Sequence, residues 1–148
     1  MRTLIKASLL ATMLLTSAAW AQTASPVGLW KTIDDETGKP KALVRITEEN
    51  GALQGKIEKL YRGPNEDQNP ACTACTDSRK NQPLVGLTIV SGLKKDGNEY
   101  TGGEILDPSK GKTYKSKATL KDNGSKLEVR GYIGAPMFGR SQTWVREQ

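Results

Sequence analysis

Apolar and polar residues alternate along most of the chain beyond residue 27, with a period of two. Successive side chains of a β-strand point to opposite faces, so each alternating set is expected to lie on one face of a sheet. No long segment shows the 3.6-residue period of a helix. The four clearest sets are Ala42, Val44 and Ile46; Leu87, Ile89, Ser91 and Leu93; Tyr114, Ser116, Ala118 and Leu120; and Leu127, Val129, Gly131 and Ile133.

Short turn sequences separate these segments. Asparagine, aspartate and glycine, which tolerate positive φ, occur at 49–51, 96–98, 107–111 and 122–124. The pattern predicts eight strands, at about 28–33, 41–48, 52–61, 85–94, 98–106, 112–121, 125–134 and 140–147. Consecutive hairpins indicate an antiparallel up-and-down meander, and closing it into a barrel removes exposed strand edges. We therefore predict an all-β, eight-stranded antiparallel barrel with room for side chains or one small ligand.

One connection differs from the short turns. Residues 62–83 contain three prolines and both cysteines and show no strand pattern. A segment of this length inside a compact domain is usually a lid, a binding loop or a flexible excursion.

The N-terminus predicts export. Arg2 and Lys6 precede an apolar run at 7–15, and Ala19-Trp20-Ala21 supplies the small residues of a signal-peptidase site. We expect residues 1–21 to be a cleaved signal peptide and residues 22–148 to form a single domain. The apolar run is shorter than the ~20 residues of a spanning helix, and we predict no transmembrane segment and a periplasmic location.

Cleavage would remove Arg2 and Lys6 and lower the formal net charge from +6 to +4. The basic residues are interspersed rather than clustered, so no nucleic-acid partner is expected. A mildly basic exported protein can contact an anionic envelope surface, although this charge is also ordinary for a soluble protein.

Cys72-Thr73-Ala74-Cys75 is the clearest chemical motif. The pair can form a disulfide, a redox centre or part of a metal site. The chain has no histidine and no second cysteine pair, which disfavours zinc. A thioredoxin-like centre needs a helix N-terminus beside the first cysteine, in a βαβ setting. In an exported β-protein we favour a local disulfide that stiffens the loop, and no metal site.

The lack of histidine also excludes Ser-His-Asp and Cys-His nucleophilic systems. Carboxylates remain as candidates for acid–base chemistry, and Asp34-Asp35-Glu36 is one cluster. Neighbouring residues of a strand point to opposite faces and Thr37-Gly38-Lys39 indicates a turn, so a solvated loop is the better interpretation. We predict no catalytic residues, no cofactor and no enzymatic activity, with an enzyme kept as the third alternative.

Gly28-Leu29-Trp30 and Trp144-Val145-Arg146 lie on the first and last predicted strands, which become neighbours when a barrel closes. We predict that Gly28, Trp30, Trp144 and Arg146 close the barrel. The guanidinium of Arg146 is expected to lie over the indole of Trp30, with Trp144 on the same face as Arg146.

These segments together resemble a bacterial family, domain-of-unknown-function family 2147, which comprises small exported proteins with a lipocalin-like, or calycin-type, barrel. The resemblance extends over about residues 26–147 and implies a fold and a compartment, but no catalytic residues. The glycine-x-tryptophan with a terminal arginine is similar to the barrel-closing pair of lipocalins. The matching segments are 27–30, 37–39, 72–75, 81–86, 105–108, 111–114, 127–134 and 139–144.

A lipocalin-like barrel implies a periplasmic, non-catalytic binding protein for a small apolar or amphipathic ligand, with an anionic ligand among the options. The main alternative is an envelope interaction module with a filled barrel that binds another protein or the cell wall. Leu, Ile, Val and Phe number 23 after residue 21, and this sparse supply favours a hollow or polar-lined barrel. The expected ligand residues near one mouth are Tyr61, Tyr114, Arg130, Tyr132, Phe138 and Arg140. The two arginines could instead be ordinary surface charges, with Phe138 packing the rim.

Overall fold

The computed structural model describes residues 24–148, so the predicted signal peptide at 1–21 lies outside the described residues and stays a prediction. Within residues 24–148, no helix is long and apolar enough to cross a membrane. The elements are β1 (Gly28–Ile33), β2 (Pro40–Glu49), β3 (Ala52–Leu60), β4 (Thr88–Asp96), β5 (Glu99–Asp107), β6 (Lys112–Lys121), the 3-10 turn η1 (Asp122–Gly124), β7 (Lys126–Tyr132) and β8 (Gly139–Arg146).

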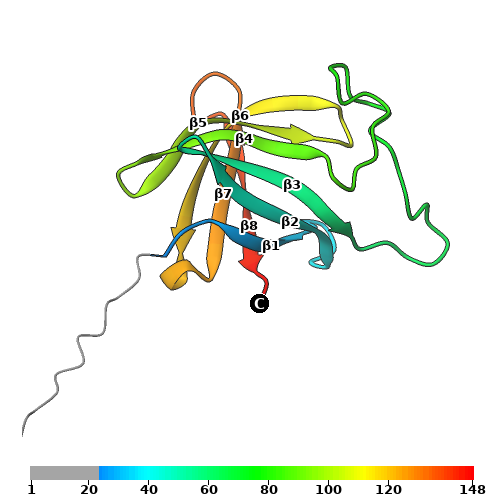
Figure 1. Cartoon of the computed structure of the whole chain (residues 1–148), viewed down its shortest axis with the longest axis horizontal. Helices are drawn as coiled ribbons and strands as arrows, with labels where there is room; N and C mark the ends of the chain where they lie inside the picture. The colour runs from blue at the N-terminus through cyan, green and yellow to red at the C-terminus, as the bar shows by residue number, and fades with distance from the viewer. Residues whose placement is uncertain (1–23) are drawn as a thin grey trace, which may run out of the picture.

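The eight strands form one closed antiparallel barrel in sequence order, β1 to β8, with β8 paired back to β1 (Figure 1). The predicted all-β, up-and-down barrel is confirmed. In this topology the β1–β2, β3–β4, β5–β6 and β7–β8 connections lie at one end, which we call the open end. The other three connections and both ends of the described chain lie at the opposite, closed end.

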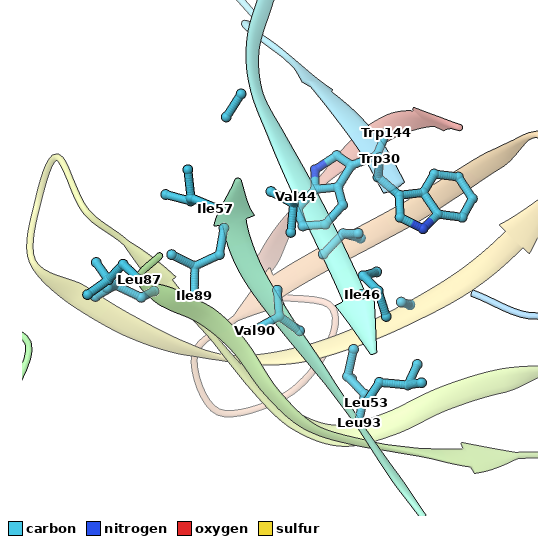
Figure 2. Packing of buried hydrophobic residues seen from close by; sticks show 14 of the residues in the cluster. Trp30, Val44, Ile46, Leu53, Ile57, Leu87, Ile89, Val90, Leu93 and Trp144 are labelled. Atoms are coloured by element: carbon cyan, nitrogen blue, oxygen red, sulfur yellow. The ribbon is translucent and has the colours of Figure 1, made fainter. Parts of the chain in front are cut away.

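Alternating residues of the strands face inward and build the core. Ala42, Val44 and Ile46 of β2 are buried, as are Leu127 and Val129 of β7, which agrees with the faces predicted from the sequence. Figure 2 shows part of this cluster, including both buried tryptophans. Burial of apolar side chains of this size contributes about 1.5–3 kcal/mol each, so this inner face is the main source of stability.

The predicted inward face of β4 is correct at Ile89 and Leu93 but wrong between them, where Val90 is buried and Ser91 is only half-buried. Val90 pairs with Gly55 and Leu93 pairs with Leu53, so three steps along β4 match two steps along β3. The extra residue is a β-bulge, and Gly92 lies within it with φ of +74°. The bulge shifts the inward face, and Val90 is buried although strict alternation with Leu93 would turn it outward.

Two predicted strand ends are also wrong. The strand expected at 85–94 begins at Thr88, because residues 84–87 form a hydrogen-bonded turn that docks on Ile57. The strand expected at 125–134 ends at Tyr132, and Ile133, predicted to share the face of Leu127, is 66% exposed in the turn that follows.

Arg146 closes the barrel at the seam between β1 and β8. Its guanidinium carbon lies 4.3 Å from the centre of the Trp30 ring, and its nitrogens donate hydrogen bonds to the carbonyl oxygens of Ser25, Val27 and Gly124. Trp30 is fully buried, and its Nε1 donates to the Pro26 oxygen at 2.8 Å.

Gly28 explains why the motif begins with glycine. Its φ is +142°, and a Cβ at this position would lie 2.8 Å from a guanidinium nitrogen of Arg146. A side chain at position 28 would therefore be strained and would displace Arg146 from the indole of Trp30. The predicted closing residues Gly28, Trp30 and Arg146 meet at the closed end in this geometry.

Candidate functional site

The barrel encloses a cavity of about 1320 Å³ that reaches the open end, where residues of all four connections line it. Pockets for small molecules usually measure about 300–1,000 Å³, so the space is ample for a guest. The cavity extends down to Trp144, whose indole forms part of its floor.

The floor of the cavity is apolar. Val44, Ile57, Val129 and Trp144 line it, and each is buried, with at most 4% of its surface exposed. Figure 2 shows Trp144 with Val44 and Ile57, which come from β8, β2 and β3. A floor of this kind stabilises a hydrocarbon chain by removing it from water.

A short chain of hydrogen bonds leads from the floor of the cavity towards its mouth. The Trp144 Nε1 donates to the Gln142 Oε1 at 3.4 Å, and the Gln142 Nε2 donates to the Asp35 carboxylate at 3.2 Å. Asp35 also lies 3.2 Å from the guanidinium of Arg140. These contacts tie the β1–β2 turn to β8 and fix the position of the indole.

Five of the six predicted ligand residues line the cavity. Tyr61, Tyr114, Tyr132 and Phe138 bring aromatic surface to its upper part. Arg140 also lines it, but the guanidinium of Arg140 pairs with Asp35, and this side chain is 76% exposed. Their shared placement at one mouth agrees with the geometry expected from the turns, while ligand contact by these residues stays a prediction.

Arg130, the sixth predicted residue, is not among the lining residues. Its guanidinium donates to the carbonyl oxygens of Pro136 (2.6 Å), Met137 and Gly139 and to the Ser141 hydroxyl. The expected contact between Arg130 and a ligand headgroup is therefore not supported. The alternation of β7 explains this result, because Val129 points inward and Arg130 outward.

Sequence reasoning missed three lysines at the mouth. Lys39, Lys41 and Lys110 line the cavity, and within residues 24–148 no carboxylate oxygen lies within 4.0 Å of their ammonium groups. Their positions in or beside the β1–β2 and β5–β6 turns were the available signal, because an up-and-down meander brings these turns to the same end.

Two carboxyls near Lys41 are held ionised. Hydrogen bonds from Thr37 keep the pKa of Asp34 below its ordinary value, and Lys41 adds to the effect. Burial opposes ionisation of Asp107, but hydrogen bonds from Ser109 and the positive charge of Lys41 leave its pKa lowered. Lys41 therefore faces two carboxylates, whereas Lys39 and Lys110 are the cations best placed to meet an anion.

The long β3–β4 connection, 61–87, is an ordered wall of the cavity. Ala71 and Pro83 form an isolated β-bridge, and the Cys72 N–H donates to the Gln82 oxygen at 2.8 Å. The predicted disulfide between Cys72 and Cys75 is confirmed, and both cysteines are buried. Among the interpretations made from the sequence, these contacts and the position beside the cavity favour a binding loop or a lid.

The same connection is fastened to the β5–β6 hairpin. Arg79 donates to the Thr88 carbonyl oxygen at 2.9 Å and to the Thr113 hydroxyl at 3.2 Å. Gly111 packs so closely on the loop that a Cβ there would collide with the Ala74 carbonyl. The loop and hairpin therefore form one side of the mouth together.

The ion pair that holds Arg79 in place predicts a pH effect. Hydrogen bonds from Arg79 lower the pKa of Asp77 from 3.8 to about 2. A carboxyl with a lowered folded-state pKa adds stability above its unfolded value and loses it as the pH falls through the folded value. We expect Asp77→Asn to reduce stability by a small, constant amount above pH 3.8 and by progressively less towards pH 2.

Urea unfolding of the wild type and Asp77→Asn over this pH range measures the difference. Asp67→Asn, at another exposed aspartate of the same connection, is the control. A gap between Asp77→Asn and the wild type that stays unchanged down to pH 2 would contradict this account.

No group of three or more histidine, cysteine, aspartate or glutamate residues in 24–148 is arranged to hold a metal ion. The cavity-lining carboxylates Asp34, Glu66 and Asp107 hydrogen-bond to backbone N–H groups or to neighbouring side chains of their own turns. The site combines an apolar interior, an aromatic upper wall and cations at the rim.

Comparison with known proteins agrees with the fold. Residues 28–146 match the model of a family described as "Uncharacterized protein conserved in bacteria (DUF2147)". The structure is similar to that of protein HP1028 from Helicobacter pylori, described as belonging to the lipocalin family, with a TM-score of 0.72, 22% sequence identity and coverage of 85% of each chain. None of the proteins with curated descriptions matches this chain significantly.

Proposed function

Starting from the premise that the chain belongs to the DUF2147 family, we propose that it is a non-catalytic binding protein for one small amphipathic molecule. The hydrocarbon part would occupy the barrel, and an anionic end would lie among the cations of the mouth. The compartment we propose is the periplasm, which suits the predicted signal peptide and the Cys72–Cys75 disulfide.

The observation that carries this proposal is the cavity of about 1320 Å³ with its apolar floor. Protein interiors are close-packed, and voids larger than a water molecule are few, so the part of this space that lies between the strands needs an explanation. It favours the hollow barrel over the filled one of the interaction-module alternative. A mostly apolar lining with a few placed polar groups is also the usual composition of a small-molecule site.

The residues at the rim of the cavity favour a ligand with an anionic end. Lys39 and Lys110 line the mouth from different turns, and Tyr61 and Tyr114 add hydroxyl donors. A carboxylate held by a charged donor forms a shorter and stronger hydrogen bond than a neutral group does. The lysines therefore favour an acid over its ester, while the floor sets the preference for a hydrocarbon chain.

Titration with cis-parinaric acid, a fluorescent fatty acid, tests the proposal. We expect saturable binding of one probe per chain and energy transfer from the floor indole of Trp144. The methyl ester of the probe should bind more weakly. Lys39→Gln/Lys110→Gln should narrow the difference between acid and ester, whereas Lys121→Gln, at the closed end, should leave it unchanged.

The absence of saturable binding for both probes would overturn the proposed function. Equal binding of acid and ester by the wild type would overturn the anionic end and retain the hydrophobic site. If Lys39→Gln/Lys110→Gln binds the acid as tightly as the wild type does, these two lysines do not contact the carboxylate of the probe.

A further inference from the structure

The turn between β7 and β8 carries the most exposed large apolar side chains of the described residues. Ile133, Met137 and Phe138 are 66%, 76% and 69% exposed, against 38–45% for the three exposed valines elsewhere. Figure 1 shows this turn, in orange, projecting past the neighbouring strands. We call residues 133–138 the apolar tip. Apolar surface gathered on a projecting turn marks a contact site rather than the scattered exposure found on every protein.

The apolar tip is held in one conformation. Arg130 of β7 reaches across it and donates to the Pro136 oxygen at 2.6 Å and to the Ser141 hydroxyl at 3.0 Å. Within the turn, the Phe138 N–H donates to the Ala135 oxygen at 3.0 Å. A surface that is already ordered loses little conformational entropy on binding, so its exposed apolar area is available to a partner.

The shape and surroundings of the apolar tip identify the partner. It is convex and narrow, which suits insertion into a deformable layer better than a flat protein surface. Lys39 and Lys110, which form no ion pair within residues 24–148, lie on the rim of the same open end. Apolar side chains next to basic ones form the arrangement that binds the interface of an anionic bilayer.

We propose that the apolar tip inserts into the surface of an anionic phospholipid bilayer and so docks the open end of the barrel on the membrane. Ile133 and Phe138 belong to the tip and also line the cavity. Docking would therefore create an unbroken apolar path from the bilayer to the floor at Trp144. That path rests on the proposed ligand-binding function, whereas docking itself does not.

Co-sedimentation with vesicles measures docking without any ligand. The vesicles are phosphatidylethanolamine mixed with phosphatidylglycerol, compared with phosphatidylcholine alone. We expect the wild type to bind the anionic vesicles more tightly. Since burial of one such side chain changes an equilibrium by about tenfold or more, Met137→Ser should weaken binding by several-fold and Ile133→Ser/Met137→Ser by more. Val27→Ser, at the closed end, is the matched control and should bind as the wild type does.

A second pair of variants reports insertion directly. The emission of Met137→Trp should shift to the blue and be quenched by brominated lipid when vesicles are added, while that of Val27→Trp should not change. Met137 does not line the cavity, so Met137→Ser should bind cis-parinaric acid normally in the absence of vesicles. If Met137→Ser loses vesicle binding but still binds cis-parinaric acid, membrane docking and ligand binding are separate properties of the protein.

Three results would overturn membrane docking. The first is a wild type that binds neither vesicle, and the second is Ile133→Ser/Met137→Ser binding as tightly as the wild type. The third is self-association through the tip, seen as a dimer in sedimentation that the double variant abolishes, together with an unshifted Met137→Trp emission. Failure of parinarate binding with vesicle docking intact would instead remove only the ligand-binding function and the apolar path.

Discussion

Trp30→Ala should lower the free energy of unfolding by about 3–5 kcal/mol, in the range found for large aromatic deletions in cores. Trp30 is fully buried and is not among the residues that line the cavity. Its removal also deletes the hydrogen bond to Pro26 and the ring beneath the guanidinium of Arg146. A cation–π contact of this kind contributes about 0.5–2 kcal/mol by itself.

Equilibrium unfolding in urea measures the change, with Trp144→Ala as the matched control. Trp144 is as buried as Trp30, but part of its indole faces the cavity, so fewer packing contacts are lost when it is truncated. We expect the smaller loss there. A Trp30→Ala variant that melts within a few degrees of the wild type would show that this indole does not close the barrel.

Replacing each of two buried alanines by phenylalanine should distinguish the hollow part of the barrel from the packed part. Ala42 lines the cavity, whereas Ala118 is buried in the core and does not line it. Overfilling a packed core costs about 1–3 kcal/mol, because neighbours must leave their preferred rotamers. We expect Ala118→Phe to lose stability of this order and Ala42→Phe to lose clearly less, since its ring can enter free space.

The same pair should separate binding from stability. Ala42→Phe should weaken binding of cis-parinaric acid, since the ring occupies part of the space meant for the guest, while Ala118→Phe should retain binding under conditions where it is folded. Thermal unfolding and probe titration of both variants provide the measurements. Equal destabilisation by both substitutions would mean that the barrel is filled in solution.

Alternation and turn residues were sufficient to predict the closed barrel because each strand has one buried face and each short turn contains residues that adopt positive φ. The same reasoning failed at β4, where the bulge at Gly92 interrupts the period of two. Periodicity alone cannot detect an inserted residue. It also failed at Ile133, because nothing in an alternating pattern marks where β7 gives way to a turn held by Arg130.

The candidate site was predicted in part for a different reason. The position of the mouth follows from the connectivity, and this placed Tyr61, Tyr132 and Phe138 at the correct end. Which cation is available depends on side-chain contacts that a sequence does not display. Arg130 is engaged by the backbone of the tip and Arg140 by Asp35, while the rim lysines went unnoticed because turn lysines are common.

The β1–β8 seam has a consequence for the order in which the barrel folds. Each of the other strand pairs joins neighbours in sequence, but the hydrogen bond from Arg146 to Val27 links residues 119 positions apart. Only two residue pairs, Trp30 with Arg146 and Lys31 with Val145, form the β-ladder between these two strands. Pairing residues so far apart in sequence costs the most chain entropy, and a ladder of two residue pairs contributes little stabilisation to offset that cost. The strands β1 to β8 should therefore pair in sequence order first. The contacts of Arg146 with Trp30 and Val27, which close the barrel between β8 and β1, should form last.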